Sequence, residues 1–499
     1  MADLTREEVE DLLEKMREIR EREEEEAASG DTSKPGPGGE PEPVPDEEEP
    51  SGEPEPPAEA AETEASGEED ENPSPETGEE TALETVEEEE EPRPSLAGCD
   101  LSGLDLSGLK FWGIDMMESN LQGTRLNDSD LSQSNLEKAD LTEADLEDAV
   151  LVAACLKSAR LGKANLEHAD LREAEVHEAD LTGANLTEAR LVRARFIRCR
   201  LQTAVLRGAD LNRANFKGAE LQETDFSDAR LAAANFYECN FTGANLTRAL
   251  IKGARLAHAL IQEARMMRAD LTGADLSDCK ILDTDLSRSK LNGSILRRAV
   301  LDGTNLSEAI LDIADCNQAS LMRVTLDGAR LNRIKLNEAN LAGAKLPGAD
   351  LSRARLVRAN LKEVDLSGGN LEEADFTEAE MEGADLSRAR LKKALLVKTH
   401  LNGSFLTGAD LREVQAEGVQ LEGADLAGAL LDRGRFKGAG MARADLHRAS
   451  LEEADLTQAD LTGADFTGAK MYRADLTGAQ QEGARFDQAD CSETRGRSA

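Results

Sequence analysis

Aspartate is the side chain that this sequence places most regularly where it could do chemistry. In one stretch, Asp455, Asp460 and Asp465 recur every five residues. Two carboxylates held close together can act as general acid and general base. Here, however, many copies of the repeat have Asp at the same position, so paired carboxylates follow from the repeat itself. We therefore interpret these aspartates as turn-stabilising or solvated groups.

Cysteine and histidine form no catalytic or metal-binding pattern in the sequence. The seven cysteines stand singly, without a CxxC pair or a Cys/His cluster at metal-ligand spacing. The sequence also lacks a nucleophile elbow, an HExxH motif, a P-loop and a GxGxxG turn after a strand. We expect no metal site, no cofactor and no enzymatic activity.

A five-residue repeat organises the chain from Leu96 to Cys491. Positions whose numbers end in 1 or 6 hold Leu, Phe, Ile, Met or Val throughout this span, except at Cys316, Ala416, Gln481 and Cys491. Two places before each of these residues the chain usually has Ala, and two polar or Gly residues follow. Internal repeats of this kind determine the architecture before any other feature is considered.

A period of five fits neither regular element. On an α-helix each step of five advances about 140° beyond a full turn, so the apolar series would scatter around the helix. On a flat strand five is odd, so successive members would point to opposite faces. The pattern therefore requires the chain to bend once in each repeat, at the polar or Gly pair. The result is a β-solenoid with apolar residues inside and polar residues outside.

Phenylalanines indicate how many repeats make one coil. Phe196, Phe216 and Phe236 are 20 residues apart, and Phe376 and Phe436 fall on the same face by the same count. This is the spacing that four repeats in each coil would give, with the rings stacked as a ladder.

The repeat resembles that of the pentapeptide-repeat proteins, whose pattern is A(D/N)LXX, as in "ADLTGADFTGAK" at Ala459–Lys470. The resemblance implies an all-β fold, a right-handed quadrilateral β-helix in which four repeats make one coil, and hence about 20 coils. Gyrase-inhibiting members of this family mimic DNA with an acidic rod. They also carry a C-terminal helical module that pairs two rods, and we find no sequence here that could form it.

Charge and composition divide the rest of the chain. The net charge is −43, and residues 1–95 hold 37 acidic and 7 basic residues, so most of the acidity lies there. We expect an amphipathic helix over 1–27, a disordered acidic linker rich in Pro, Glu and Gly over 28–95, the β-helix over 96–491 and a flexible C-terminal tail over 492–499.

Near the start of the β-helix, Leu104, Leu109 and Ile114 replace the small residue, and Trp112 follows Phe111. This bulk predicts a cap over the first coil.

Two surfaces are candidate interaction sites. Thr5 and Glu8 have capping-box spacing, and the helix that follows has an apolar stripe with nothing local to bury against, formed by Val9, Leu12, Leu13, Met16 and Ile19. The stripe indicates a docking helix; a frayed, charged leader is the alternative.

The second surface comprises apolar residues at outward places, namely Leu250, Leu260, Ile295, Val300 and Ile310. Of these, Leu260 and Val300 fall on one face two coils apart, and Leu250 lies one corner away.

These observations favour a structural or interaction scaffold, a rigid rod with a tethered docking helix. The alternative is a DNA-mimic inhibitor of a topoisomerase such as gyrase. The near-balanced charge of the repeats and local basic patches such as Leu191–Arg200 count against it. Such a patch could also be either a solvated face or a contact site. We expect a protein partner, leave end-to-end pairing of two rods open, and expect no direct binding of nucleic acid. No segment predicts a membrane span or a signal peptide, which favours a cytoplasmic location.

Overall fold

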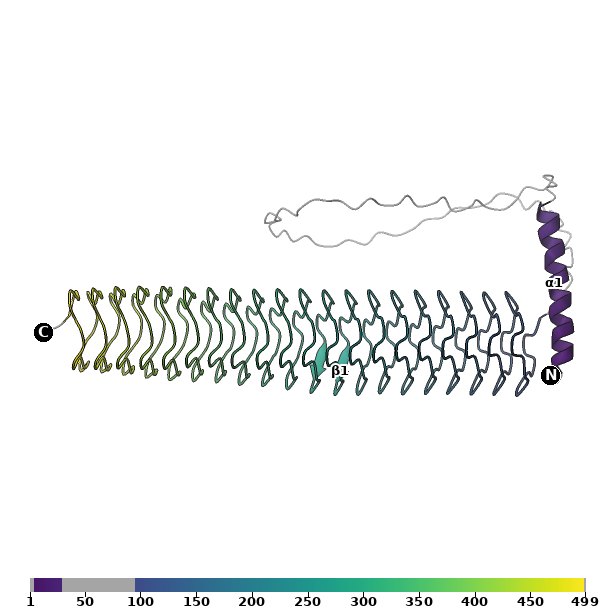
Figure 1. Ribbon diagram of the computed structural model, residues 1–499, viewed down its shortest axis with the longest axis horizontal. Helices are drawn as coiled ribbons and strands as arrows, with labels where there is room; N and C mark the ends of the chain where they lie inside the picture. The colour runs from purple at the N-terminus through teal and green to yellow at the C-terminus, as the bar shows by residue number, and fades with distance from the viewer. Residues whose placement is uncertain (1–3, 29–94, 498–499) are drawn as a thin grey trace, which may run out of the picture. The chain divides into compact units, whose positions relative to one another are not determined.

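The computed structural model describes residues 4–28 and 95–497 (Figure 1). One helix, α1, runs from Arg6 to Ala28, where the sequence predicted a helix over 1–27. The expected linker lies almost wholly outside the described residues. The beginning of α1, as far as Leu13, belongs to the same compact unit as the chain from Ser95 onward.

Parallel pairing at a fixed interval builds the coils. Each outward residue just before the large apolar one bridges the residue 20 places later, from Asp100 with Asn120 through to Asp475 with Arg495. Four repeats therefore make one coil, as the family resemblance implied and the phenylalanine spacing indicated. Among the described residues, only one pair of segments is long enough to form named strands, β1 (Leu260–Gln262) and β2 (Lys280–Leu282), which pair in parallel with Ile261 opposite Ile281. Successive coils lie side by side in Figure 1.

Backbone hydrogen bonds repeat with the same period. Around Leu126, for example, the Leu126 N–H donates to the Asp145 carbonyl of the next coil at 2.7 Å, and the Arg125 N–H donates to the Leu104 carbonyl of the preceding coil at 2.9 Å. A third bond closes each corner, such as that from the Ser129 N–H to the Leu126 carbonyl at 3.1 Å. A corner in the middle of the array is therefore hydrogen-bonded within itself and to both neighbouring coils.

Each corner places one residue in the left-handed region. The second residue after the large apolar one has a positive φ whether it is glycine, as at Gly183 (69°), or not, as at Arg193 (61°). A side chain in this conformation costs roughly 1–2 kcal/mol relative to the right-handed region. The inter-coil bonds on both sides of the corner offset that cost, which explains why so many corners manage without glycine.

The large apolar side chains fill the interior. Leu, Phe, Ile and Met of the series are almost all fully buried. The Phe196 and Phe216 rings stack with centroids 4.8 Å apart, and the Phe216 and Phe236 rings with centroids 5.1 Å apart. The predicted ladder is therefore present at these three residues.

The small position is buried beside them and accepts polar substitutes only with a partner. The Thr124 hydroxyl donates to the Leu101 carbonyl at 3.0 Å, and the Cys199 thiol contacts the Val176 carbonyl at 2.6 Å. Burial raises the pKa of Cys199, like those of Cys239 and Cys279, to about 12. These thiols remain protonated at neutral pH and behave as small apolar residues.

The recurring aspartates stabilise the corners. Oδ1 of Asp475 accepts bonds from the Thr477 N–H at 2.9 Å and from the Thr477 hydroxyl at 2.5 Å. These two bonds lower the pKa of Asp475, with the hydroxyl as the larger cause. Asparagine can do the same with its amide oxygen, since Asn245 accepts the Thr247 N–H at 3.2 Å. The aspartate carboxylates therefore accept hydrogen bonds from residues of their own turns.

The coils continue past the expected boundary at Cys491. Arg495 still bridges Asp475, and the Thr494 hydroxyl donates to the Met471 carbonyl at 2.8 Å. The interior positions of the last coil, Gln481, Phe486 and Cys491, are half-buried. Within residues 4–28 and 95–497, no helix has the length and apolar character needed to cross a membrane.

Removing one ring from the ladder should loosen the coils around it. We expect Phe216→Ala to destabilise these coils by about 3–5 kcal/mol, because a buried aromatic side chain is lost and a cavity remains. Phe216→Leu, which restores the commonest residue of the series, should cost far less. Amide hydrogen exchange, read coil by coil, is the suitable measurement because a long repeat array does not unfold in a two-state manner. Equal effects of the two substitutions would contradict the inward placement of Phe216.

The corner aspartates should make stability depend on acid pH. Hydroxyl and N–H donors lower the pKa values of Asp460, Asp465 and Asp475. A lowered pKa in the folded state means that the carboxylate stabilises the fold above its unfolded value of about 3.9, and that this contribution disappears as the pH falls through the folded pKa. We expect the Asp460→Asn, Asp465→Asn, Asp475→Asn variant to have a lower Tm than the parent at pH 7, because a neutral amide oxygen accepts weaker hydrogen bonds than a carboxylate. Its Tm should fall less steeply between about pH 5 and pH 2, and an unchanged slope would refute the role of the carboxylates.

Candidate interaction site

The start of α1 is a well-formed helix terminus. The Thr5 N–H and hydroxyl donate to Glu8 Oε2 at 2.7 and 2.8 Å, and the Glu8 N–H approaches the Thr5 hydroxyl at 3.4 Å. The predicted capping box is therefore present. The Thr5 N–H, followed by its hydroxyl, lowers the pKa of Glu8, which keeps this carboxylate charged at the positive end of the helix dipole.

The apolar stripe of α1 is divided between buried and exposed side chains. Val9 is fully buried, Leu12 and Leu13 are half-buried, Met16 is 9% exposed and Ile19 is 38% exposed. The expectation that this stripe has nothing local to bury against is wrong for Val9. Val9 belongs to the part of α1 that forms one unit with the coils.

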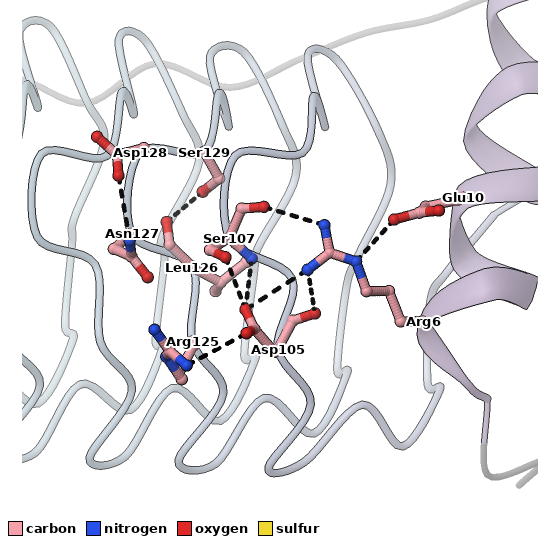
Figure 2. A network of polar contacts seen from close by, with 9 residues as sticks. All are labelled: Arg6, Glu10, Asp105, Ser107, Arg125, Leu126, Asn127, Asp128 and Ser129. Carbon is pink, nitrogen blue, oxygen red and sulfur yellow. Dashed lines mark hydrogen bonds and ion pairs between the residues drawn. The ribbon is translucent and has the colours of Figure 1, made fainter.

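Arg6 connects α1 to the first coil (Figure 2). Its Nη1 donates to the Asp105 carbonyl at 2.9 Å and its Nη2 to the Ser107 carbonyl at 3.4 Å. Arg6 Nη1 also lies 3.5 Å from Asp105 Oδ1, while Nε donates to Glu10 at 2.7 Å. The Asp105 carboxylate further pairs with Arg125 at 3.2 Å. The pKa of Asp105 is lowered, most strongly by the Ser107 hydroxyl and then by the Ser107 N–H.

The bulky residues that the sequence predicted as a cap belong to the first coil. Leu104, Leu109 and Ile114 are half-buried, whereas Ser119 and Thr124, in the same position of the next coil, are buried. The large apolar residues of the first coil are fully covered. Trp112 is different, because it sits at a corner and is 39% exposed.

The second candidate surface does not form one apolar patch. Leu250 and Ile310 belong to one ladder of bridged residues, but Asp270 and Lys290 lie between them. Leu260 and Val300 share a second ladder, separated by Lys280, and Ile295 stands in a third. Leu250 and Ile295 are exposed, and the other three are half-buried. These five residues are therefore isolated apolar side chains among charged neighbours.

The basic patch around Leu191–Arg200 is largely neutralised by the preceding coil. Arg193 pairs with Glu173, Arg195 with Glu175 and Arg200 with Asp180, each a carboxylate 20 residues earlier. A shallow hollow of about 390 Å³ lies beside this patch, lined by Val152, Arg172, Glu173, Val192, Arg193, Asn212 and Arg213. This pairing favours a solvated face over a contact site.

Arg6 is the residue that sequence reasoning missed. It is one of many charged residues on α1, and no spacing distinguishes it from Arg17 or Arg20. Ile313, 57% exposed at a corner, was also missed. Among the described residues, no group of three His, Cys, Asp or Glu side chains is arranged to hold a metal ion.

Comparison with known proteins gives a consistent family assignment. The family model described as pentapeptide repeats matches residues 95–188, 282–428 and 439–478 in overlapping copies, and the model described as a pentapeptide repeat region matches 189–266. No relative is found among the curated proteins.

Solved structures of pentapeptide repeat proteins also match. HetL, involved in heterocyst differentiation regulation in the cyanobacterium Nostoc sp. strain PCC 7120, is 28% identical over 57% of this chain and 89% of its own, with a TM-score of 0.14. QnrB1, a plasmid-mediated fluoroquinolone resistance protein, is 19% identical over 35% of this chain and 85% of its own, with a TM-score of 0.24. A pentapeptide repeat protein from the Arabidopsis thaliana thylakoid lumen is 25% identical over 25% of this chain and 67% of its own, with a TM-score of 0.12.

The family models cover most of the chain and coincide with the coils that the bridges define. This protein therefore belongs to the pentapeptide repeat family.

Proposed function

We propose that this protein is a non-enzymatic interaction scaffold, in which the coil stack is a rigid rod and α1 docks a protein partner. The right-handed, quadrilateral form expected from the family is part of this proposal. The observation that carries it is the apolar stripe of α1, where Ile19 is exposed and Leu12 and Leu13 are half-buried on a helix that is otherwise charged. A helix of this kind binds by laying its apolar side chains into a groove of the partner.

The coil surface supports a positioning role. Many of its charges are paired from coil to coil, such as Arg248 with Asp228 at 2.6 Å and Arg298 with Asp278 at 2.7 Å. Exposed pairs of this kind contribute little to stability, but they leave the middle of the rod without a dominant charge. A DNA mimic needs a continuous acidic surface, so these paired arginines favour the scaffold over an inhibitor of gyrase.

Partner binding should depend on the apolar stripe of α1. We expect the Leu12→Asp, Ile19→Asp variant to lose its partner, because two charges replace apolar side chains seven residues apart on the helix. Its matched control is the Lys15→Glu, Arg22→Glu variant, which has the same spacing and a larger change of charge on exposed positions. Affinity purification with quantitative mass spectrometry should show proteins retained by the parent and the control but lost from the first variant. Circular dichroism should show that the coils of all three are intact.

The opposite result has a defined form. If the Leu12→Asp, Ile19→Asp variant keeps every partner, and the chain inhibits supercoiling by DNA gyrase in a manner that weakens with salt, the docking role of α1 is refuted. Salt sensitivity identifies the inhibitor because a DNA mimic acts through screened charge.

A further inference from the structure

We propose that the first two turns of α1 form a reversible cap on the first coil, and that this cap controls whether the docking helix is available. The inference rests on the proposed function, because it concerns regulation of the same apolar stripe. It is carried by the contacts of Arg6 and Val9, two residues in the unit that the start of α1 forms with the coils.

At the first described coil, the Arg6 side chain takes the place of the N–H donors that a preceding coil provides elsewhere in the array. In later coils, the two carbonyls at this corner accept N–H groups from the coil before: the Arg125 carbonyl accepts the Leu106 N–H at 2.8 Å, and the Asn127 carbonyl accepts the Gly108 N–H at 3.0 Å. The equivalent carbonyls of the first coil are those of Asp105 and Ser107. Both accept the Arg6 guanidinium instead, at 2.9 and 3.4 Å. One planar side chain thus replaces two backbone donors (Figure 2).

This substitution satisfies a specific need of a coil edge. Buried or half-buried carbonyls without a donor are costly, and an open edge of parallel bridges is a template for pairing with another chain. A charged donor makes a stronger hydrogen bond than a neutral amide. The contact therefore favours a guanidinium, whose rigid planar fork reaches two carbonyls at once, over the compact ammonium of a lysine.

Val9 provides the apolar part of the cap. It lies three residues after Arg6 on the helix and is fully buried, whereas Leu12 and Leu13 of the same unit are only half-buried. A side chain that is fully buried in this unit, as Val9 is, cannot contact a partner at the same time. Closing the cap therefore removes part of the stripe from the surface.

The closed state rests on few contacts, which makes it reversible. The described hydrogen bonds between the start of α1 and the coil come from one side chain. Most of the stability of a helix in a protein comes from packing of its apolar face, and Val9 is the fully buried residue of that face here. Regions held by few buried contacts open locally with a much smaller free energy than the core of the fold.

The test uses the full chain and a pair of matched variants. Arg6 and Arg17 each pair with a glutamate four residues later, at 2.7 and 2.9 Å, but only Arg6 also donates to the coil. Arg6→Ala therefore removes a helix pair and the cap contact, whereas Arg17→Ala removes a helix pair alone. The probe is a fluorescent synthetic peptide of residues 1–27, which carries its own Arg6 and Val9 and competes with the tethered helix for the first coil.

We expect the peptide to bind the Arg6→Ala chain at least about tenfold more tightly than the parent or the Arg17→Ala chain, because hydrogen bonds to a charged group are worth about a factor of ten or more. Amide hydrogen exchange in residues 9–13 should accelerate about tenfold in the Arg6→Ala chain and stay unchanged in the Arg17→Ala chain. A peptide that itself carries Arg6→Ala should bind the first coil more weakly than the parent peptide.

Equal peptide affinity for all three chains, an absence of peptide binding to the Arg6→Ala chain, or unchanged exchange in residues 9–13 would overturn the cap. None of these measurements involves a partner. Failure of the proposed docking role is detected separately, by partner retention in the Leu12→Asp, Ile19→Asp variant.

Discussion

The hydrogen bond between a residue and the coil above it is the interaction on which the rest of this structure depends. Each large apolar residue donates its N–H to a carbonyl of the following coil, and each bridge residue donates to the preceding one. The chain can keep this register only by turning once every five residues, with a left-handed residue at each corner. The buried ladders, the corner aspartates and the coil-to-coil ion pairs all follow from that register, because a side chain always meets its counterpart 20 residues away.

This register makes the sides of the stack different from its first coil. Along the sides, backbone hydrogen bonds join each coil to its neighbours, and charged side chains pair with the neighbouring coil, as Arg298 does with Asp278. At the first coil the register has no predecessor among the described residues, and the Asp105 and Ser107 carbonyls take a donor from α1 instead. The first coil therefore differs from the rest of the array, because a side chain, Arg6, takes the place of backbone donors there.

Periodicity made most of the coil architecture predictable. The five-residue period excluded helix and flat strand. The family resemblance implied four repeats in a coil, and the spacing of Phe196, Phe216 and Phe236 agreed with it because stacked rings must share a face. The corner role of the aspartates also followed, since the repeat placed them beside the turn. The contact of α1 was not predictable in the same way, because an amphipathic stripe shows which side chains seek burial and not which surface covers them. The role of Arg6 could not be predicted for a similar reason. Arg6 donates to two backbone carbonyls at sequence separations of 99 and 101, and every residue has a backbone carbonyl, so the sequence does not distinguish these two.

The division of labour between α1 and the coils is the central claim, and grafting α1 tests it most directly. Residues 1–28, fused to an unrelated carrier protein, lack every coil and therefore any surface that the coils could offer. We expect this fusion to capture the same partners as the full chain, with at least the same affinity, because no first coil competes for Val9. Capture of those partners by the coils alone, with none by the fusion, would instead place recognition on the rod.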